Sequence, residues 1–291
     1  MTSHIQTLRA LLRDENGVLL PGAADALTAR IVEDLGFKAV YLTGAGLTNT
    51  HLGLPDLGFM DLSQVAEHVL AIRGVVELPL IVDIDTGFGN AINVAHAVRT
   101  LEQAGASAVQ LEDQHAPKRC GHFEGKELIS AEEMVGKVRA AADARRQDMV
   151  IIARTDAIAV EGFEAAIDRA GRYIAAGADM TFVEAPETLD DLRAVPERLA
   201  APQMLNMVLG GKTPIVDAAA AGAMGFGLVL YANAALQAAI QGMQTTLRAL
   251  KTNGVLDEST VTSFAARQRL VGQAAFDAME VRYAAGVPTH V

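Results

Sequence analysis

The sequence has no tryptophan and a single cysteine, and aromatic residues make up only 4% of its 291 residues. Its core must therefore be built from aliphatic side chains, and one cysteine excludes a disulfide within the chain, as is typical of a reducing compartment. No apolar run approaches the roughly 18 uncharged residues of a membrane-spanning helix, and the N-terminal residues lack the long apolar segment of a secretory signal. These absences predict a soluble cytoplasmic protein with no membrane partner.

Positive charge is also scarce. Lysine and arginine total 24 against 35 aspartates and glutamates, so the net charge is −11. This balance excludes nucleic acid and anionic membranes as expected partners, and a small molecule remains the expected one. With 51% hydrophobic and 20% charged residues, the chain is typical of a protein with one large core, and α/β barrels reach this length as a single domain.

Short apolar runs recur along the chain, each followed by a turn and then by a segment with apolar residues at three- and four-residue spacing. Alternating strands and helices pair their strands in parallel, and eight units favour a (β/α)8 barrel, a single domain over residues 1–291. A doubly wound open sheet is the alternative, disfavoured because no run is followed by a Gly-x-Gly-x-x-Gly turn. The eight predicted strands are Val18–Pro21, Ala39–Thr43, Leu80–Asp85, Ala108–Glu112, Val150–Arg154, Met180–Glu184, Met204–Asn206 and Gly227–Tyr231.

Glycines and the last part of the chain complete the fold prediction. Gly36, Gly105, Gly177 and Gly222 are predicted to end helices, where a residue with positive φ is commonly required. Residues from about 236 to 291 have a helical pattern and exceed what a barrel needs. We expect these additional C-terminal helices to pack on the barrel or to reach a neighbouring subunit.

Polar residues follow the predicted strands at the point where each strand ends. In a barrel these ends converge on one mouth, where barrel enzymes carry out their chemistry. Crowded carboxylates there would repel one another without a cation, and oxygen ligands without clustered histidines favour Mg²⁺ or Mn²⁺ over zinc. We predict that Asp85 contacts the metal directly and that Asp83 and Glu112 hold its water shell. The residues at the strand ends are Asp83, Asp85, Glu112, Asp113, Arg154, Asp156, Glu184 and Asn206.

Three further features of the predicted mouth suit a carboxylate substrate. The Thr43-Gly44-Ala45-Gly46 turn is rich in backbone N–H groups, although any tight turn after a strand has a similar composition. Arg154 suits bidentate carboxylate recognition, and the alternative is that it pairs with a neighbouring aspartate. Tyr41 is either a proton carrier or a packing residue of the barrel, and the sequence favours neither.

The single cysteine lies in the polar run Lys118-Arg119-Cys120-Gly121-His122. Lone cysteines are commonly small buried hydrophobes, but two cations, a glycine and a histidine surround this one. Such surroundings lower the pKa of a thiol or orient it for proton transfer. We therefore interpret Cys120 as a functional residue.

At these residues the chain resembles the isocitrate lyase/phosphoenolpyruvate mutase superfamily, over nearly its whole length. The Lys-Arg-Cys-Gly-His run is typical of the lyase branch of that superfamily. The motifs that carry the resemblance are Tyr41-Leu42-Thr43-Gly44, Gly53-Leu54-Pro55-Asp56, Asp83-Ile84-Asp85-Thr86-Gly87-Phe88-Gly89, Leu111-Glu112-Asp113-Gln114, Pro117-Lys118-Arg119-Cys120-Gly121-His122 and Ala153-Arg154-Thr155-Asp156-Ala157.

The resemblance implies a Mg²⁺-dependent barrel that cleaves a C–C bond of a small 2-hydroxy di- or tricarboxylate, of the methylisocitrate or dimethylmalate type, through an enolate. It also implies a homotetramer whose C-terminal helices are swapped between paired barrels. Asp85 would bind the metal, and three further carboxylates would hold its waters: Asp56, Asp83 and Glu112.

The same resemblance implies roles for the residues that touch the substrate. Cys120 would donate a proton to the departing carbanion, and Tyr41 is a candidate base. Lys118 and His122, on the segment of the cysteine, are the other catalytic candidates. The implied substrate-binding residues are Thr43, Gly44, Ala45, Gly121, Arg154, Glu184 and Asn206.

The chain departs from the methylisocitrate lyase pattern after Asn206. Where those lyases carry hydroxyl and acidic residues, this chain has Met207-Val208-Leu209, and Val208 has no side-chain group for hydrogen bonding. The departure favours a substituted malate over a tricarboxylate. The segments 118–130 and 210–214 also resemble phosphonomutases of the carboxyphosphonoenolpyruvate type, which makes a phosphonomutase the alternative function. An oxaloacetate decarboxylase or hydrolase and a non-catalytic binding protein are less favoured.

Overall fold

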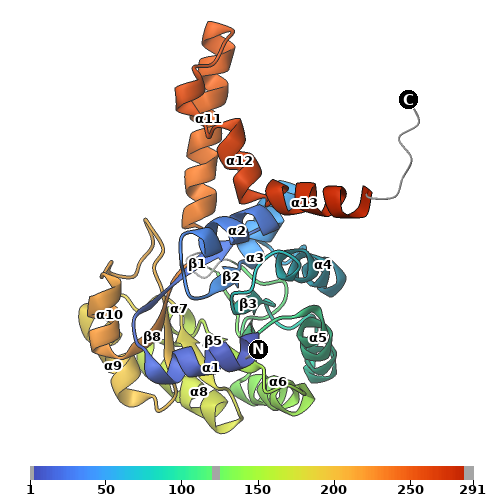
Figure 1. Ribbon diagram of the computed structural model, residues 1–291. Helices are drawn as coiled ribbons and strands as arrows, with labels where there is room; N and C mark the ends of the chain where they lie inside the picture. The colour runs from blue at the N-terminus through green and yellow to red at the C-terminus, as the bar shows by residue number, and fades with distance from the viewer. Residues whose placement is uncertain (1–2, 120–124, 285–291) are drawn as a thin grey trace, which may run out of the picture. The chain divides into compact units, whose positions relative to one another are not determined.

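The computed structural model describes residues 3–119 and 125–284, and the chain divides into two compact units, Met1–Leu236 and Gln237–Val291. The first unit is a closed barrel of eight parallel strands, each hydrogen-bonded to the next in sequence (Figure 1). Strand β1 pairs with β8, with Val18 opposite Leu228, and this pairing closes the ring. The eight strands are β1 (Val18–Ala23), β2 (Val40–Leu42), β3 (Leu80–Asp83), β4 (Ala108–Glu112), β5 (Val150–Thr155), β6 (Met180–Val183), β7 (Gln203–Asn206) and β8 (Phe226–Tyr231). The predicted (β/α)8 barrel is confirmed.

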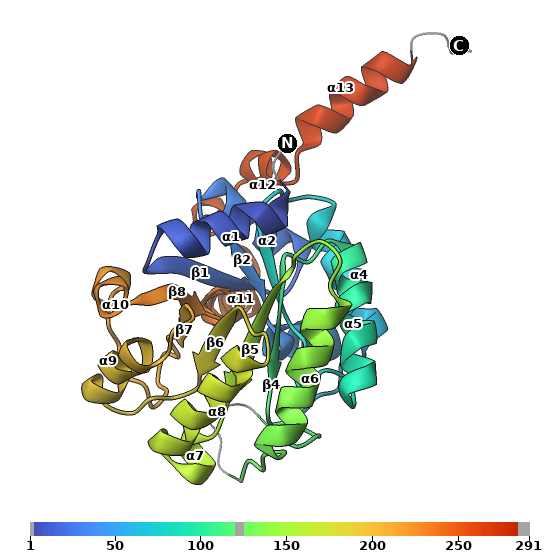
Figure 2. The same ribbon diagram turned by 90° about the horizontal axis from the view of Figure 1, so that it is seen from below.

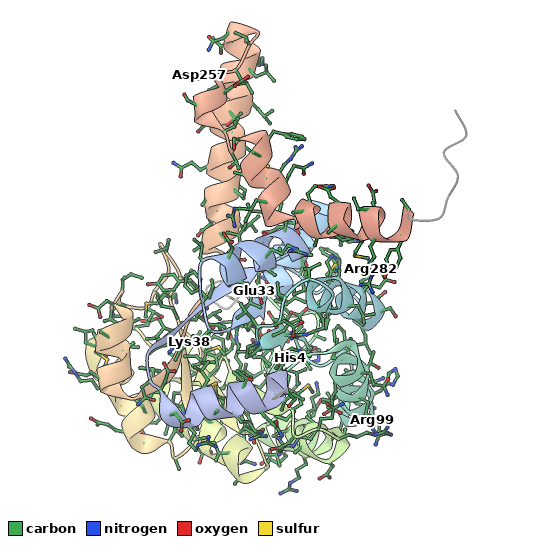
Figure 3. The ribbon with its side chains drawn as sticks, viewed as in Figure 1. His4, Glu33, Lys38, Arg99, Asp257 and Arg282 are labelled. Carbon is green, nitrogen blue, oxygen red and sulfur yellow. The ribbon has the colours of Figure 1, made fainter. Side chains whose placement is uncertain are left out.

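Helices lie outside the ring of strands, as Figure 2 shows for α4 to α10. The charged side chains of Lys38 and Arg99 are exposed on this outer surface (Figure 3). In the described ranges, no helix has the length and apolar character needed to cross a membrane. The helices of the first unit are α1 (His4–Asp14), α2 (Ala26–Asp34), α3 (Gly44–Leu47), η1 (Thr48–Leu52), α4 (Leu62–Arg73), α5 (Ala91–Ala104), α6 (Ala131–Ala144), α7 (Ile158–Glu161), α8 (Phe163–Ala175), α9 (Leu189–Arg198) and α10 (Ala218–Met224).

The strands are apolar on both faces because each face packs against a different layer. In β4, Val109 and Leu111 belong to the core between strands and helices, whereas Ala108 belongs to the barrel interior. Because side chains alternate along a strand, Gln110 and Glu112 share the inner face with Ala108. The same alternation decides which polar residues can reach the mouth of the barrel.

Helix α1 covers the end of the barrel where the strands begin (Figure 1). Its Leu8 and Leu11 belong to the same buried cluster as the inward side chains of the strands. Arg9 donates from Nε to the carbonyl oxygen of Asp148, 2.7 Å away, and from Nη2 to Asp179, 3.1 Å away. The helix therefore closes the barrel interior at the end opposite the mouth.

Replacing Leu8 with alanine should lower the free energy of unfolding by about 2–5 kcal/mol, because the side chain is fully buried and its removal leaves a cavity. Leu70→Ala on α4 is the matched control, since that leucine is 56% exposed and its loss should cost under about 0.5 kcal/mol. Urea denaturation of both variants measures the difference. Equal midpoints for the two would contradict a structural role for α1.

One predicted helix end is wrong. Gly36, Gly105 and Gly177 have the expected positive φ, but α10 continues through Gly222 and ends at Gly225, whose φ is +103°. Gly222 has another role, because a Cβ atom there would lie 3.0 Å from the backbone nitrogen of Gly17. This close approach of α10 to the start of β1 requires glycine and cannot be read from local sequence.

The second unit is helical over its described residues, up to 284, as the sequence pattern there predicts. It contains α11 (Ala234–Asn253), which begins in the first unit, η2 (Glu258–Thr260), α12 (Phe264–Leu270) and α13 (Gln273–Ala284). Asp257 caps η2 by accepting a hydrogen bond from the backbone nitrogen of Ser259, 2.9 Å away (Figure 3). Large apolar side chains recur on α11 at helical spacing and are exposed: Ile240, Met243, Leu247 and Leu250.

Candidate active site

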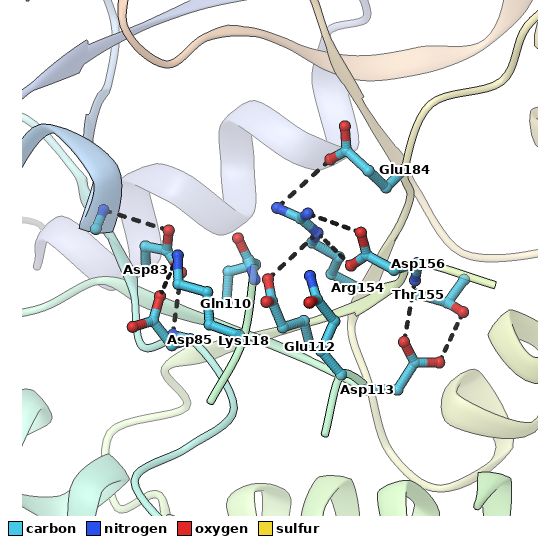
Figure 4. Close-up of polar contacts among 12 residues, drawn as sticks. Asp83, Asp85, Gln110, Glu112, Asp113, Lys118, Arg154, Thr155, Asp156 and Glu184 are labelled. Carbon is cyan, nitrogen blue, oxygen red and sulfur yellow. Dashed lines mark hydrogen bonds and ion pairs between the residues drawn. The ribbon is translucent and has the colours of Figure 1, made fainter. Parts of the chain in front are cut away.

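The carboxyl ends of the strands bring the predicted site residues together at one mouth of the barrel (Figure 4). Asp83 ends β3 and Glu112 ends β4, while Arg154 lies near the end of β5. Glu184 follows β6 directly, and Asn206 ends β7. The side-chain Oδ1 of Asn206 is buried and has no hydrogen-bond partner among the described residues. The convergence predicted from strand topology is therefore observed.

On one side of the mouth, Asp83 and Asp85 are fixed by the backbone. Asp83 accepts hydrogen bonds from the backbone nitrogens of Asp85, at 3.1 Å, and of Gly44, at 3.3 Å. Asp85 has a φ of +48°, an uncommon conformation for a residue with a side chain. A Cβ atom on Gly44 would lie 3.0 Å from Asp85 Oδ1. Gly44 therefore leaves the space that the aspartate needs.

Lys118 joins Asp85, the predicted metal ligand, to Asp56, one of the residues predicted to hold the metal's waters. Its Nζ is 2.5 Å from Asp56 Oδ1 and 3.0 Å from Asp85 Oδ1, and its side chain is almost fully buried. Burial raises the pKa of the Asp85 carboxyl to about 6, although the Lys118 charge opposes this shift. Burial lowers the pKa of Lys118, but Asp85 and the other carboxylates outweigh burial and raise it. Lys118 is therefore an ammonium ion bound by carboxylates.

This arrangement fits a hard divalent cation. The oxygens of Asp56 and Asp85 converge on one positive charge, that of Lys118. Within residues 3–119 and 125–284, no three His, Cys, Asp or Glu side chains form a ready-made metal cluster. Mg²⁺ commonly takes one or two carboxylates and keeps several waters, whereas zinc sites in proteins are usually built with Cys or His ligands. The donor set therefore suits Mg²⁺ or Mn²⁺. The assignment of Asp85 as direct ligand, with Asp56, Asp83 and Glu112 around it, stays a prediction.

On the other side of the mouth, Arg154 is surrounded by carboxylates. Its Nε and Nη2 contact the two oxygens of Asp156 at 2.9 and 3.0 Å. Nε lies 3.3 Å from Glu112 Oε2, and Nη1 lies 3.4 Å from Glu184 Oε2. Burial opposes ionisation of Asp156, but the charges of Arg154 and Lys126 outweigh it and lower its pKa to about 2. The sequence left two interpretations of Arg154, substrate recognition and pairing with a neighbouring aspartate. The pairing is observed, with Asp156, and the guanidinium also faces the mouth.

Asp113 lies behind the mouth and not in it. Its carboxylate is fully buried and accepts hydrogen bonds from Thr155 Oγ1, Tyr173 Oη and the backbone nitrogen of Asp156, at 2.7, 2.7 and 3.0 Å. Of the adjacent pair Glu112-Asp113, only Glu112 faces the barrel interior, because successive residues of a strand point to opposite faces. Asp113 therefore holds the backbone that positions Asp156.

Lys126, which sequence reasoning did not select, completes this side. Lys126 Nζ lies 2.9 Å from Asp156 Oδ1, and both side chains are buried. Asp156 thus bridges Lys126 and Arg154. Asp156 is among the strand-end residues selected from the sequence, but nothing in the sequence links Lys126 to this aspartate 30 positions away.

Tyr41 lies in β2, at the floor of the mouth, and packs in the barrel interior. Its hydroxyl donates to Gln110 Oε1, 2.6 Å away. Burial, together with the charge of Asp83, raises the pKa of the Tyr41 phenol well above its usual value of 10.0. The tyrosine is therefore a neutral hydrogen-bond donor, and its role as a base stays a prediction.

The turn Thr43-Gly44-Ala45-Gly46, predicted to bind a carboxylate, lies at the start of a short helix, α3. Thr43 caps this helix by accepting from the backbone nitrogen of Gly46, 3.3 Å away, and donates to Asn233 Oδ1, also 3.3 Å away. The backbone nitrogen of Gly44 faces Asp83, and Ala45 is half-buried. The helix thus borders the side of the mouth that holds Asp83, and carboxylate binding there stays a prediction.

Cys120, Gly121 and His122 lie outside the described residues. The residue before them is anchored, because Arg119 donates its backbone N–H to Gln114 Oε1 at 2.9 Å, and Gln114 Nε2 donates to the Arg119 carbonyl oxygen at 2.8 Å. Gln114 follows the end of β4. The chain therefore enters the cysteine segment from the mouth, and the roles of the three residues stay predictions.

Comparison with known proteins decides the family. A family model described as Phosphoenolpyruvate phosphomutase matches residues 8–251. The chain belongs to the PEP mutase/isocitrate lyase superfamily. It is 41% identical over 284 residues to 2,3-dimethylmalate lyase of Eubacterium barkeri, covering 96% of this chain and 98% of the relative. It is 45% identical over 247 residues to 2-methylisocitrate lyase of Aeropyrum pernix, covering 85% and 80%.

Solved structures of the superfamily share the fold over almost the full length. The crystal structure of a 2,3-dimethylmalate lyase matches with a TM-score of 0.91 and 35% identity, covering 99% of this chain and 97% of that one. A phosphonopyruvate hydrolase in complex with oxalate and Mg²⁺ matches with a TM-score of 0.86 and 33% identity, covering 97% and 99%. The resemblance drawn from the motifs is confirmed, and the protein is an enzyme, a lyase of this superfamily.

Proposed function

We propose that this superfamily lyase is a Mg²⁺-dependent enzyme that cleaves the C–C bond of a small 2-hydroxy carboxylate through an enolate. The observation that carries the proposal is the division of the mouth into two charged sides. One side has the aspartates around Lys118, suited to a metal, and the other has the buried guanidinium of Arg154, suited to a carboxylate. The names and coverage of the two lyase relatives support the same reaction type. Mn²⁺ is the alternative metal.

The residues around the mouth would have the following roles. A bound metal, held by Asp85 and the water-holding carboxylates Asp56, Asp83 and Glu112, would supply positive charge to the enolate oxygen. The substrate's carboxylate would lie between Arg154 and the backbone of α3, at Thr43, Gly44 and Ala45. Further contacts would come from Gly121, Glu184 and Asn206, with Lys118 and His122 assisting catalysis and Tyr41 as the candidate base.

Cys120 would supply the proton that the departing carbanion needs. A thiol with an ordinary pKa of about 8.5 is mostly protonated at neutral pH and can act as a general acid. As the C–C bond breaks, the proton of the 2-hydroxyl group would pass to the candidate base, Tyr41, and the hydroxyl oxygen would become the carbonyl oxygen of the 2-oxo acid. The bonding electron pair stays on the second fragment, whose carbon takes the thiol proton. The thiolate is then reprotonated from solvent.

Among 2-hydroxy carboxylates, we propose a substituted malate of the dimethylmalate type. The loop after β7 has Met207, which is buried, and Val208, which is half-buried. Neither side chain offers a strong hydrogen bond to a third carboxylate. A panel of methylated malates, methylisocitrate, isocitrate and oxaloacetate, assayed for release of a 2-oxo acid, would identify the substrate.

Cys120→Ser should lower kcat by about 10²- to 10⁴-fold, because a serine hydroxyl is a far weaker acid than a thiol. Substrate binding, measured by calorimetry, should change little. Ser130→Ala, at the start of α6 beyond the cysteine segment, is a suitable control because Ser130 only caps that helix. Near-full activity in the serine variant would remove the proposed role of the cysteine.

Phosphonate chemistry is the second candidate, and the match to a phosphonopyruvate hydrolase favours it. Phosphorus NMR of the enzyme with phosphonopyruvate discriminates between the two. A rearranged or hydrolysed phosphorus product, formed faster than any carboxylate is cleaved, would replace the lyase proposal.

We propose that the enzyme is a cytoplasmic homotetramer in which the C-terminal helices are exchanged between paired barrels. The exposed apolar residues of α11 support a protein partner for this helix. Light scattering during size-exclusion chromatography should give four times the 30.6 kDa chain mass. A monomeric mass would contradict the assembly.

A further inference from the structure

Gln110 is a polar residue of the barrel interior to which the sequence assigned no role. It lies in β4, two residues before Glu112 and on the same inward face. The residue is completely buried. Its Oε1 accepts the hydroxyl of Tyr41 at 2.6 Å, and this bond fixes the orientation of the amide.

The other end of the same amide has no partner. Gln110 Nε2 is buried and has no hydrogen-bond partner among the described residues, and the same is true of Glu112 Oε1. Figure 4 shows the two side chains next to each other at the floor of the mouth. The reverse orientation of the amide would turn its oxygen toward the carboxylate, acceptor against acceptor, so the N–H₂ group belongs on this side.

A buried donor without a partner costs about 1–3 kcal/mol, so the pair is suited to a ligand that satisfies both groups. A hydroxyl group does so, because its oxygen accepts from Gln110 Nε2 and its proton is donated to Glu112 Oε1. A 2-oxo group or a carboxylate oxygen can only accept, and opposite the ionised form of Glu112 it would face an oxygen without a proton between them.

We propose that Gln110 is a further substrate-binding residue, which recognises the 2-hydroxyl group of the substrate together with Glu112, and that Tyr41 is the positioning residue of its amide. The inference rests on the proposed function, because it requires a 2-hydroxy carboxylate in this mouth. It adds a specificity, since the site selects 2-hydroxy acids over acids that lack the hydroxyl.

Two simple dicarboxylates test the proposal by calorimetry in the presence of Mg²⁺: malate, which has the 2-hydroxyl, and succinate, which lacks it. The full-length enzyme should bind malate about 10- to 100-fold more tightly than succinate, as expected for a hydrogen-bonded hydroxyl. In Gln110→Met this preference should fall below about 3-fold through weaker malate binding, with succinate binding nearly unchanged. Gln110→Glu, which keeps the acceptor for Tyr41 but lacks the donor, should lose the preference as well.

Gln203→Met is the matched control. Gln203 is also a fully buried strand glutamine whose Oε1 accepts a hydroxyl, that of Thr181 at 2.8 Å, but its Nε2 is satisfied by the carbonyl oxygen of Ala201 at 2.7 Å. This variant should keep the preference for malate. Tyr41→Phe should reduce the preference, because the amide is then free to rotate, and full retention would overturn the positioning role.

The outcomes separate this inference from the proposed function. If the enzyme binds both dicarboxylates and Gln110→Met keeps the preference for malate, or if no preference exists, the role of Gln110 is wrong and the carboxylate site stands. If the enzyme binds neither dicarboxylate, the proposed function fails and the inference fails with it.

Discussion

Asp85→Asn should lower kcat/KM by about 10³-fold, which corresponds to about 4 kcal/mol of lost transition-state stabilisation. The change removes the negative charge of the proposed metal ligand and keeps its shape, and asparagine tolerates the left-handed conformation at φ +48°. Binding of Mn²⁺, measured by electron paramagnetic resonance, should weaken in parallel. Unchanged Mn²⁺ affinity would mean that Asp85 is not the ligand.

The stability of the same variant should move in the opposite direction. Burial raises the pKa of Asp85 to about 6 in the folded protein, above its usual 3.8. Folding therefore favours the protonated carboxyl, and the stability that this form contributes at low pH is lost as the pH rises through the folded pKa of about 6. The metal-free Asn variant should melt at the same temperature as the wild type or higher. Asp148→Asn, on another aspartate with positive φ (+62°) at the opposite end of the barrel, controls for the backbone.

Arg154→Met should have the second large effect, on both folding and activity. The guanidinium balances the charges of Glu112, Asp156 and Glu184, and its removal leaves buried carboxylates without that partner. Breaking such a buried network commonly costs about 3–5 kcal/mol. We expect a loss of this size in the free energy of unfolding, together with a kcat/KM lowered by about 10³-fold as the substrate's carboxylate loses its cation.

Two further variants separate these effects. Arg154→Lys keeps the positive charge but lacks the planar guanidinium that contacts both oxygens of Asp156. Its free energy of unfolding should therefore recover in part, while its activity stays low. Arg172→Met, on a half-buried arginine of α8 paired with the exposed Glu132, should change stability by less than about 1 kcal/mol. A folded, active Arg154→Met enzyme with wild-type affinity for dicarboxylates would contradict the proposed carboxylate side of the mouth.

The strands could be predicted from the sequence because their signals are local. Each is a short apolar run bounded by turn residues, and parallel closure then determines that Asp83, Glu112 and Arg154 share one end. The period of two along a strand also separates Glu112 from Asp113, although the sequence reasoning treated them as a pair. Applied to β4, the same period would have indicated Gln110 two residues earlier.

The contacts that escaped prediction join residues far apart in the chain. Tyr41 meets Gln110 across 69 positions, and Lys118 meets Asp56 across 62. The close approach of Gly222 to Gly17 is another case. Residue type gives no indication of such partners, because the chain has other lysines and many other glycines of the same chemistry. The actual partners are determined by how the folded barrel packs.

The pairing of β1 with β8 has a consequence for synthesis on the ribosome. The hydrogen bonds between these strands join residues 18–21 to residues 228–231, so the ring cannot close until nearly four-fifths of the chain has been translated. Until then the first strand keeps an unpaired edge, which is prone to association with other nascent chains. Such long-range closure also slows folding relative to proteins with mainly local contacts.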